Sequence, residues 1–296
     1  MTRTGPKRRR RAPGLAGALA LATLLSSCAR GEERARALAG EETEDAAPPR
    51  GTFDDASAPL VEAPECAEET AQIFVVATDK GFYRFDPQDL AFVRVGTLGC
   101  PTTAGTFSMA IDRRGTAWVE YTDGRIYAVD TRDATCKPTA FRPGQTGFDL
   151  FGMGFALNGD DPKGGETLFV AGNGLASLDT KSFDLTFLGS LTLGRSELTS
   201  IGSRLYAFSV DSGVVARLNK ETGATEATHR TSAIAPSGAF AFAHWGGSFW
   251  LFTGQTRSRV TTYSPDTDES TDVVADTGML IVGAGSSTCA PLTPPK

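Results

Sequence analysis

Cysteine and histidine set the first limits on the chemistry available to this chain of 296 residues. Its two histidines, His229 and His244, lie fifteen residues apart without an HExxH arrangement, which argues against a histidine-built metal site. No CxxC pair is present, so a zinc or thiol-redox motif is also missing. Cys28 belongs to an N-terminal export pattern described below, and four cysteines follow it. An even number of cysteines in an exported chain predicts two disulfides. We therefore expect no metal and no cofactor.

Carboxylates are the other groups that could react or bind. Asp149, Glu197 and Asp276 lie close before, or near the start of, short runs that contain small residues, and Arg195 and Ser237 lie in equivalent places. Paired carboxylates separated by about 5 to 10 Å can carry out acid–base chemistry on a sugar, as a hydrolase or lyase would. The same side chains could instead hold a cation or polar ligand, or be hydrated loop residues. Which of these roles applies depends on how the strands and loops that carry these residues are arranged.

Composition and motifs exclude several other functions. The net charge of −6 argues against nucleic-acid binding. The sequence contains no run of 18 apolar residues, no P-loop and no GxSxG motif. An oxygen-rich stretch from Asn158 to Asp161, followed by Glu166, does not have the ligand spacing of an EF-hand. No catalytic constellation is recognisable, and the expectation is a chain that is not an enzyme.

The N-terminus has the pattern of a targeting segment. Six basic residues between positions 2 and 11 precede an apolar stretch from Leu15 to Leu25, which is the length of a signal-peptide core. The stretch ends in Leu25-Ser26-Ser27-Cys28, which resembles the lipobox of bacterial lipoproteins. The resemblance implies cleavage after residue 27 and acylation of Cys28, with palmitate or a similar chain. It implies a lipid anchor in the cell envelope, and Ala29, which is not an aspartate, favours the outer membrane.

Residues 28–65 read as a tether. Positions 29–65 hold ten acidic residues and four arginines but few large apolar groups. Such a segment cannot bury enough surface to offset the entropy of ordering it, so we expect disorder. The expected organisation is a signal peptide at 1–27, a lipidated acidic tether at 28–65, a folded domain at 66–289 and a tail at 290–296.

The folded part repeats one hairpin. Apolar or alternating runs are joined by short polar turns such as Asp123-Gly124, which favour tight hairpins. The five predicted hairpins are 73–78 with 82–86, 116–121 with 125–130, 168–172 with 174–179, 205–208 with 214–219, and 249–252 with 259–263.

A strand with small residues precedes or follows each hairpin. The starts of these strands are 40 to 47 residues apart, at 108–112, 152–156, 199–202, 239–243 and 280–285. Small residues suit an innermost strand, and outer strands are expected at 92–97 and 185–189. The pattern resembles the β-propeller superfamily, with blades of about 40 to 45 residues. The fold class expected is all-β, with five four-stranded blades; six remain possible if residues 140–165 contain more strands.

The chain ends suggest how the ring closes. The first hairpin has no inner strand before it and the last inner strand has no hairpin after it, so we expect the C-terminal strand to complete the first blade. Four cysteines allow three pairings. Cys66 and Cys289 flank the repeats, whereas Cys100 and Cys136 follow the outer strands of successive blades. We therefore predict the pairs Cys66–Cys289 and Cys100–Cys136.

Propellers generally bind ligands at one mouth of the central channel. The resemblance therefore implies that the loops entering the inner strands carry the binding residues, which here are Asp149, Arg195, Glu197, Ser237 and Asp276. The function expected is a membrane-anchored binding or interaction module, monomeric, whose partner is an envelope protein or a polar ligand and not nucleic acid. The alternative is a secreted propeller enzyme, a hydrolase or lyase, with its acids at the channel mouth.

Overall fold

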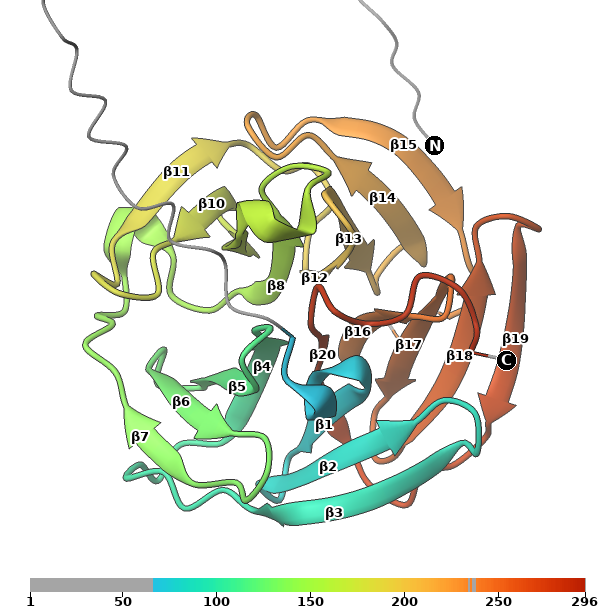
Figure 1. The fold of residues 1–296 in the computed structure, drawn as a ribbon, viewed down its shortest axis with the longest axis horizontal. Coiled ribbons are helices and arrows are strands. Elements are labelled where there is room, and N and C mark those ends of the chain that lie inside the picture. Colours follow the sequence, from blue (N-terminus) through green and yellow to red (C-terminus); the bar gives the residue numbers. More distant parts are fainter. Residues whose placement is uncertain (1–65, 234, 236–237, 296) are drawn as a thin grey trace, which may run out of the picture. The chain divides into compact units, whose positions relative to one another are not determined.

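The computed structural model describes residues 66–233, 235 and 238–295, and over this range the backbone forms twenty strands. They make five antiparallel sheets of four strands, arranged about one axis as a five-bladed β-propeller (Figure 1). The predicted all-β class and the blade count are confirmed, since residues 140–165 add no sixth sheet. The predicted signal peptide, the tether, Cys28 and Ser237 lie outside the described residues. No helix of the described part is long and apolar enough to cross a membrane.

Each blade runs from an inner strand at the axis to an outer strand at the rim. The inner strands are β4 (Thr106–Ile111), β8 (Gly152–Leu157), β12 (Ser196–Ile201), β16 (Ala239–Trp245) and β20 (Ile281–Ser286). The middle strands are β1 (Ile73–Ala77) with β2 (Gly81–Asp86), β5 (Thr116–Tyr121) with β6 (Ile126–Asp130), β9 (Glu166–Gly172) with β10 (Gly174–Leu178), β13 (Arg204–Ser209) with β14 (Val214–Leu218), and β17 (Ser248–Gly254) with β18 (Ser258–Ser264). The outer strands are β3 (Ala91–Thr97), β7 (Cys136–Pro138), β11 (Leu185–Gly189), β15 (Thr225–Arg230) and β19 (Glu269–Val274).

Burial decreases from the axis to the rim. All five residues of β1 are buried, whereas β15 has none. Strands near the axis pack against neighbouring blades on both faces, so most of their residues are buried, including polar ones in β4 and β12. Rim strands face solvent and carry polar or alternating sequences. Three short 3-10 helices, η1 (Glu68–Ala71), η2 (Gln145–Gly147) and η3 (Pro162–Gly164), lie in the connections.

Glycines allow the inner strands to approach one another. A Cβ added at Gly152 would overlap the carbonyl oxygen of Ser196, and one at Gly154 would lie 2.7 Å from the carbonyl group of Leu198. Strand β8 therefore meets the backbone of β12 with no side chain between them. A Cβ at Gly283 in β20 would likewise lie 3.0 Å from the backbone nitrogen of Met109 in β4. The small residues recognised in the sequence thus serve the packing about the axis.

We expect Gly154→Ala to destabilise the fold by about 1–3 kcal/mol, because the methyl group would have to displace the β12 backbone. Chemical denaturation of the variant and the parent measures the difference. Gly159→Ala is the matched control, since nothing lies within 4 Å of a Cβ at that position. Equal losses in the two variants would contradict close packing of β8 on β12.

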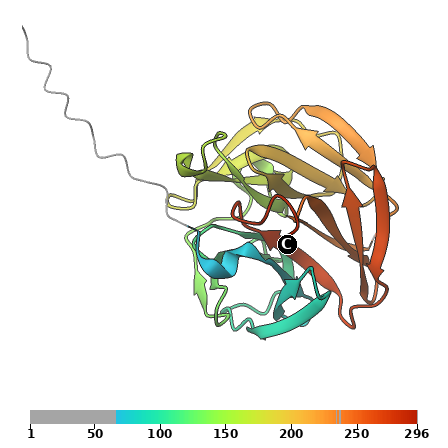
Figure 2. The ribbon, with the colours of Figure 1, turned by 45° about the vertical axis from the view of Figure 1, so that its right-hand side comes forward.

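The ring closes through the two ends of the folded part. Strand β20 pairs antiparallel with β1, with Ile73 opposite Ser286 and Val76 opposite Gly283, and so provides the inner strand of the first blade. The segment after β20 lies at the same end of the ring as η1, and the Ser287 hydroxyl donates to the Thr70 carbonyl at 2.9 Å (Figure 1 and Figure 2). This is the predicted closure.

Both predicted disulfides are present. Cys66 pairs with Cys289 across the closure, with a Cα–Cα distance of 5.9 Å, and Cys100 pairs with Cys136 at 5.2 Å. Cys136 was expected to follow an outer strand, but it is the first residue of the outer strand β7 itself. The second bond therefore ties the rim of the second blade to the connection from the first.

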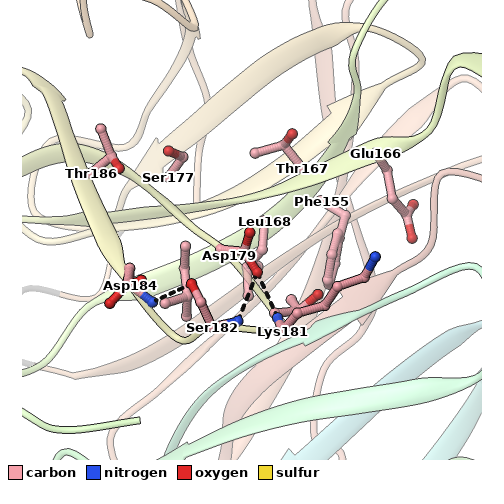
Figure 3. Close-up of a pocket in the computed structure, with 12 residues that line it drawn as sticks. Phe155, Glu166, Thr167, Leu168, Ser177, Asp179, Lys181, Ser182, Asp184 and Thr186 are labelled. Atoms are coloured by element: carbon pink, nitrogen blue, oxygen red, sulfur yellow. Dashed lines mark hydrogen bonds between the residues drawn. The ribbon is translucent and has the colours of Figure 1, made fainter.

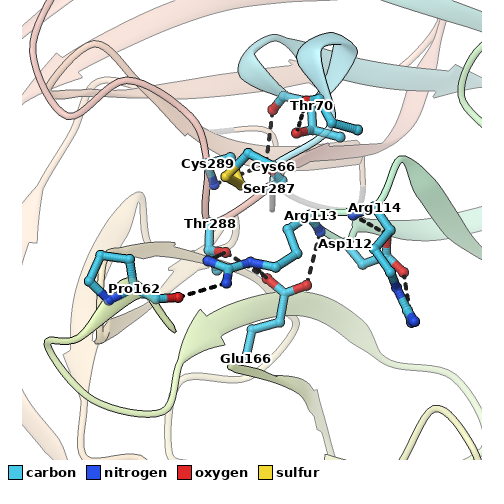
Figure 4. Close-up of a disulfide and its surroundings, with 11 residues drawn as sticks. Cys66, Thr70, Asp112, Arg113, Arg114, Pro162, Glu166, Ser287, Thr288 and Cys289 are labelled. Atoms are coloured by element: carbon cyan, nitrogen blue, oxygen red, sulfur yellow. Dashed lines mark hydrogen bonds and ion pairs between the residues drawn. A yellow bond between two sulfur atoms is a disulfide. The ribbon is translucent and has the colours of Figure 1, made fainter. Parts of the chain in front are cut away.

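A buried polar network lies beside the Cys66–Cys289 bond (Figure 4). Arg113, 5% exposed, donates to the Pro162 carbonyl at 2.7 Å and to the Thr288 hydroxyl at 3.4 Å. Glu166 accepts the Arg113 backbone N–H at 2.9 Å and the Thr288 hydroxyl at 2.6 Å. The C-terminal segment is thus held to the second and third blades as well as to the first.

Removing the pair Cys66 and Cys289 by double serine substitution should lower stability more than removing Cys100 and Cys136. The two bonds span 223 and 36 residues, and the chain-entropy model assigns them about 5 and about 4 kcal/mol. The first also holds the closure, whose opening exposes an unpaired strand edge. Thermal melts and light scattering compare the two double variants. A larger loss for the second pair would contradict this ranking.

Candidate functional site

The predicted binding residues lie at one end of the axis, here called the entry end, where the chain enters the inner strands from the preceding blade. Asp149, Arg195 and Asp276 are exposed in the connections that lead into β8, β12 and β20. Glu197 lies inside β12 and is 3% exposed. Strand β12 begins at Ser196, three residues before the predicted start. The prediction missed this start because the first two residues, Ser196 and Glu197, are polar and do not continue the apolar pattern.

Two of these residues already have partners of opposite charge. The Arg195 guanidinium forms two hydrogen bonds with the Asp211 carboxylate, at 2.6 and 3.2 Å, and lies over the Phe240 ring at 5.3 Å. Asp276 accepts the Gly278 backbone N–H at 2.7 Å and pairs with Arg257 at 3.0 Å. The backbone hydrogen bond, and then Arg257, lower the pKa of the Asp276 carboxyl.

The three predicted acids are not linked directly. Among the described residues, no hydrogen bond or ion pair joins Asp149, Glu197 and Asp276 to one another. Their role in binding, and that of Arg195, stays a prediction.

Glu197 instead connects three blades across the axis. Its Oε2 accepts the Ser108 hydroxyl of β4 at 2.9 Å and the Met153 backbone N–H of β8 at 3.3 Å. Since Glu197 belongs to β12, one carboxyl group joins the inner strands of the second, third and fourth blades. Burial raises the pKa of this carboxyl well above its usual range, against the opposite effect of its two hydrogen bonds.

A second carboxyl group lies close to the first and was missed by the sequence analysis. Glu120, in β5, is fully buried, and its Oε2 accepts the Phe151 backbone N–H at 3.1 Å. Its Oε1 is buried without a hydrogen-bond partner. Burial raises the pKa of Glu120 well above its usual range, and the charge of Glu197 raises it further. Glu120 and Glu197 are called the buried carboxyl pair below.

The sequence did contain a signal for Glu120. It is the one charged residue in the predicted strand 116–121, at a place where the apolar run predicts burial on both faces. A buried acid in such a strand needs partners, and these come from residues distant in the sequence. The pairing with Glu197 therefore depends on how the blades are packed.

A groove of about 550 Å³ lies along the third blade, lined by residues of β8, β9, β10 and β11 (Figure 3). Asp179 there accepts the backbone N–H groups of Lys181 and Ser182 at 2.7 and 3.0 Å, and these bonds lower its pKa. Glu166 borders the groove and belongs to the network beside the disulfide. Asp179 thus holds a turn, and Glu166 helps to hold blades together.

The two histidines lie in different surroundings. His244 is 1% exposed at the end of β16, and its Nε2 has no hydrogen-bond partner. Burial, and then the positive charge of Arg204, lower its pKa from 6.5 to about 4. His229 lies in outer strand β15, 3.7 Å from the carboxylate of Asp268. Within the described part of the chain, no group of three or more His, Cys, Asp or Glu side chains is placed to hold a metal ion.

The lowered pKa of His244 predicts acid lability. Folding keeps the ring neutral, so its contribution to stability is complete above pH 6.5 and is lost as the pH falls to about 4, by on the order of 3 kcal/mol. We expect His244→Leu to remove this loss, as measured by the free energy of unfolding between pH 4 and 7. His229→Leu, at a partly exposed ring, should retain it. An unchanged pH dependence in His244→Leu would contradict the assignment.

Comparisons with known proteins give no family. No protein-family model matches the chain, and no curated protein matches it. Among solved structures, a chain of a nidogen/laminin complex is similar, with 14% identity and a TM-score of 0.45, over 74% of this chain and 86% of that one. A chain of a mitotic checkpoint complex has 13% identity and a TM-score of 0.38, over 82% and 76%.

The extracellular domain of a putative hybrid two-component system from B. thetaiotaomicron has 16% identity and a TM-score of 0.38, over 73% of this chain and 29% of that one. At these levels of similarity the class rests on the strand pairing of the chain itself. By that pairing the protein is a five-bladed, disulfide-closed β-propeller.

Proposed function

We propose that the protein is a lipid-anchored binding module of the bacterial cell envelope, attached through Cys28, and that Ala29, the residue that follows, directs it to the outer membrane. The lipobox-like Leu25-Ser26-Ser27-Cys28 and the preceding basic and apolar segments support the anchor. The propeller fold supports a binding or interaction role, because it holds loops from five blades at fixed positions.

One observation supports a binding site at the entry end. The entry end brings exposed polar side chains from different blades to the same end of a rigid ring, among them Asp149 and Asp276. Beneath them lies the buried carboxyl pair. We assign the ligand, an envelope protein or another polar molecule, to this end, with the exposed Asp149, Arg195 and Asp276 as its contacts. Of the other two predicted contacts, Glu197 is buried below this surface and Ser237 lies outside the described residues.

The anchor is tested by Cys28→Ala. Removing the thiol should prevent acylation, so the protein should leave the membrane fraction or remain unprocessed. Cell fractionation and mass spectrometry of the N-terminal peptide measure both effects, and Gly159→Ala, where an added Cβ meets nothing within 4 Å, is the control that leaves the anchor and the disulfides intact. Absence of an acyl group on Cys28 in the parent would overturn the lipoprotein assignment.

The binding site is tested by cross-linking in cells. The double variant Asp149→Asn/Asp276→Asn changes two exposed acids of the entry end, and we expect it to reduce capture of the partner by at least about fivefold if the two acids contribute one kcal/mol in total. Asp89→Asn/Asp184→Asn, at exposed turn residues elsewhere, makes the same change in charge and should leave capture unaltered. Equal capture by both variants would place the site elsewhere.

A further inference from the structure

The buried carboxyl pair lies at the entry end, directly on the inner part of the ring. Glu197 is the second residue of β12, and Ser108 is the third residue of β4. Glu120 lies opposite Ser108 in the register of β4 and β5, so the two side chains share one face of the second blade. The three oxygen-bearing side chains therefore come from two inner strands and the strand next to one of them.

The hydrogen bonds leave this group of side chains incomplete. One oxygen of Glu197 accepts two hydrogen bonds and one oxygen of Glu120 accepts one, but Glu120 Oε1 has none although the residue is fully buried. A buried carboxyl oxygen without a partner is costly. No arginine or lysine forms an ion pair with either carboxyl group among the described residues, so this part of the chain supplies no ion-pair partner to the two acids.

We propose that a hard divalent cation, of the class of Ca²⁺, binds between Glu120 and Glu197, with the Ser108 hydroxyl as a third oxygen ligand. The donor set contains oxygen only, which Ca²⁺ prefers and which does not favour zinc or copper. Two carboxylates balance the charge of one divalent ion, and Glu120 Oε1 gains the partner that it lacks. Because Ca²⁺ takes about six to eight oxygen ligands, we expect each carboxylate to bind through both oxygens and neighbouring backbone carbonyl oxygens to complete the shell.

This inference deepens the proposed function and rests on its placement of the binding site at the entry end. Glu197, one of the residues that the sequence predicted for binding, is buried below the exposed ones, so a bound ion would form the floor of the binding surface. With two carboxylates, the affinity should fall in the range of extracellular calcium modules, a Kd of about 10⁻⁴–10⁻³ M. The ion would also connect the second and fourth blades through ligands on both.

The test uses the full chain, purified in detergent, stripped with EDTA and titrated with CaCl₂. We expect one calcium ion per chain by elemental analysis after equilibrium dialysis, and a melting temperature that rises with calcium concentration. MgCl₂ in a parallel titration tests whether the site prefers the larger ion. A parent protein that binds no calcium at millimolar concentration overturns the proposal whatever the variants do.

Variants locate the site. Glu120→Gln and Glu197→Gln keep the shape of the side chain and should weaken calcium binding by about tenfold or more, since even residues outside the first ligand shell contribute that much. Glu166→Gln is the control, because this buried carboxylate is already engaged by Arg113 and Thr288. Circular dichroism and the disulfide map report folding of each variant. Calcium binding retained by both folded variants would overturn the site.

The outcomes also separate this inference from the proposed function. Attachment to the membrane through Cys28 and cross-linking at the entry end are measured without added calcium. Intact attachment and cross-linking in a protein that binds no calcium would overturn the cation site alone. Loss of partner capture in Asp149→Asn/Asp276→Asn does not depend on either residue of the buried carboxyl pair.

Discussion

The close approach of five inner strands around one axis is the constraint on which the rest of this structure depends. Strands β8 and β12 touch backbone to backbone because Gly152 and Gly154 have no side chain to hold them apart. Gly283 has the same effect between β20 and β4. With so little space at the axis, polar groups on the inner strands must find partners on neighbouring blades, since water has limited access to them. The contacts of Glu197 with Ser108 and Met153 follow from this crowding.

Closure of the ring is the second condition. The first blade is complete only when β20, from the end of the chain, joins β1 near the start of the folded part. This pairing has the largest sequence separation in the fold, so its loop-closure entropy is high. The Cys66–Cys289 bond and the network of Arg113, Glu166 and Thr288 both act at this point. Stabilising contacts are therefore concentrated where the ring is least favoured by its own connectivity.

Much of the fold was accessible from the sequence because its signals are local. Alternating runs joined by turns such as Asp123-Gly124 define hairpins, and their regular spacing defines blades. The disulfide pairing followed from the positions of the cysteines relative to those blades. The buried carboxyl pair was not predictable in this way, since Glu120 and Glu197 are distant in the sequence and meet only when the blades pack. The burial of Glu197 was missed because β12 begins three residues earlier than its apolar pattern indicates. The Arg195–Asp211 pair was missed because it depends on the conformation of a turn.

The Cys66–Cys289 bond has a mechanical consequence. A tensile force applied to the chain before Cys66 passes through the sulfur–sulfur bond to Cys289 at the other end of the propeller sequence. If the chain is held beyond Cys289, the load bypasses all twenty strands and their hydrogen bonds. If the chain is held at any blade, the disulfide carries the force at the closure. Strands β1 and β20 then cannot separate starting from Ile73 and Ser286, the paired ends next to the bond. The bond thus closes residues 66–289 into one covalent loop, so the two ends of the propeller sequence stay joined under load even when blades within the loop unfold.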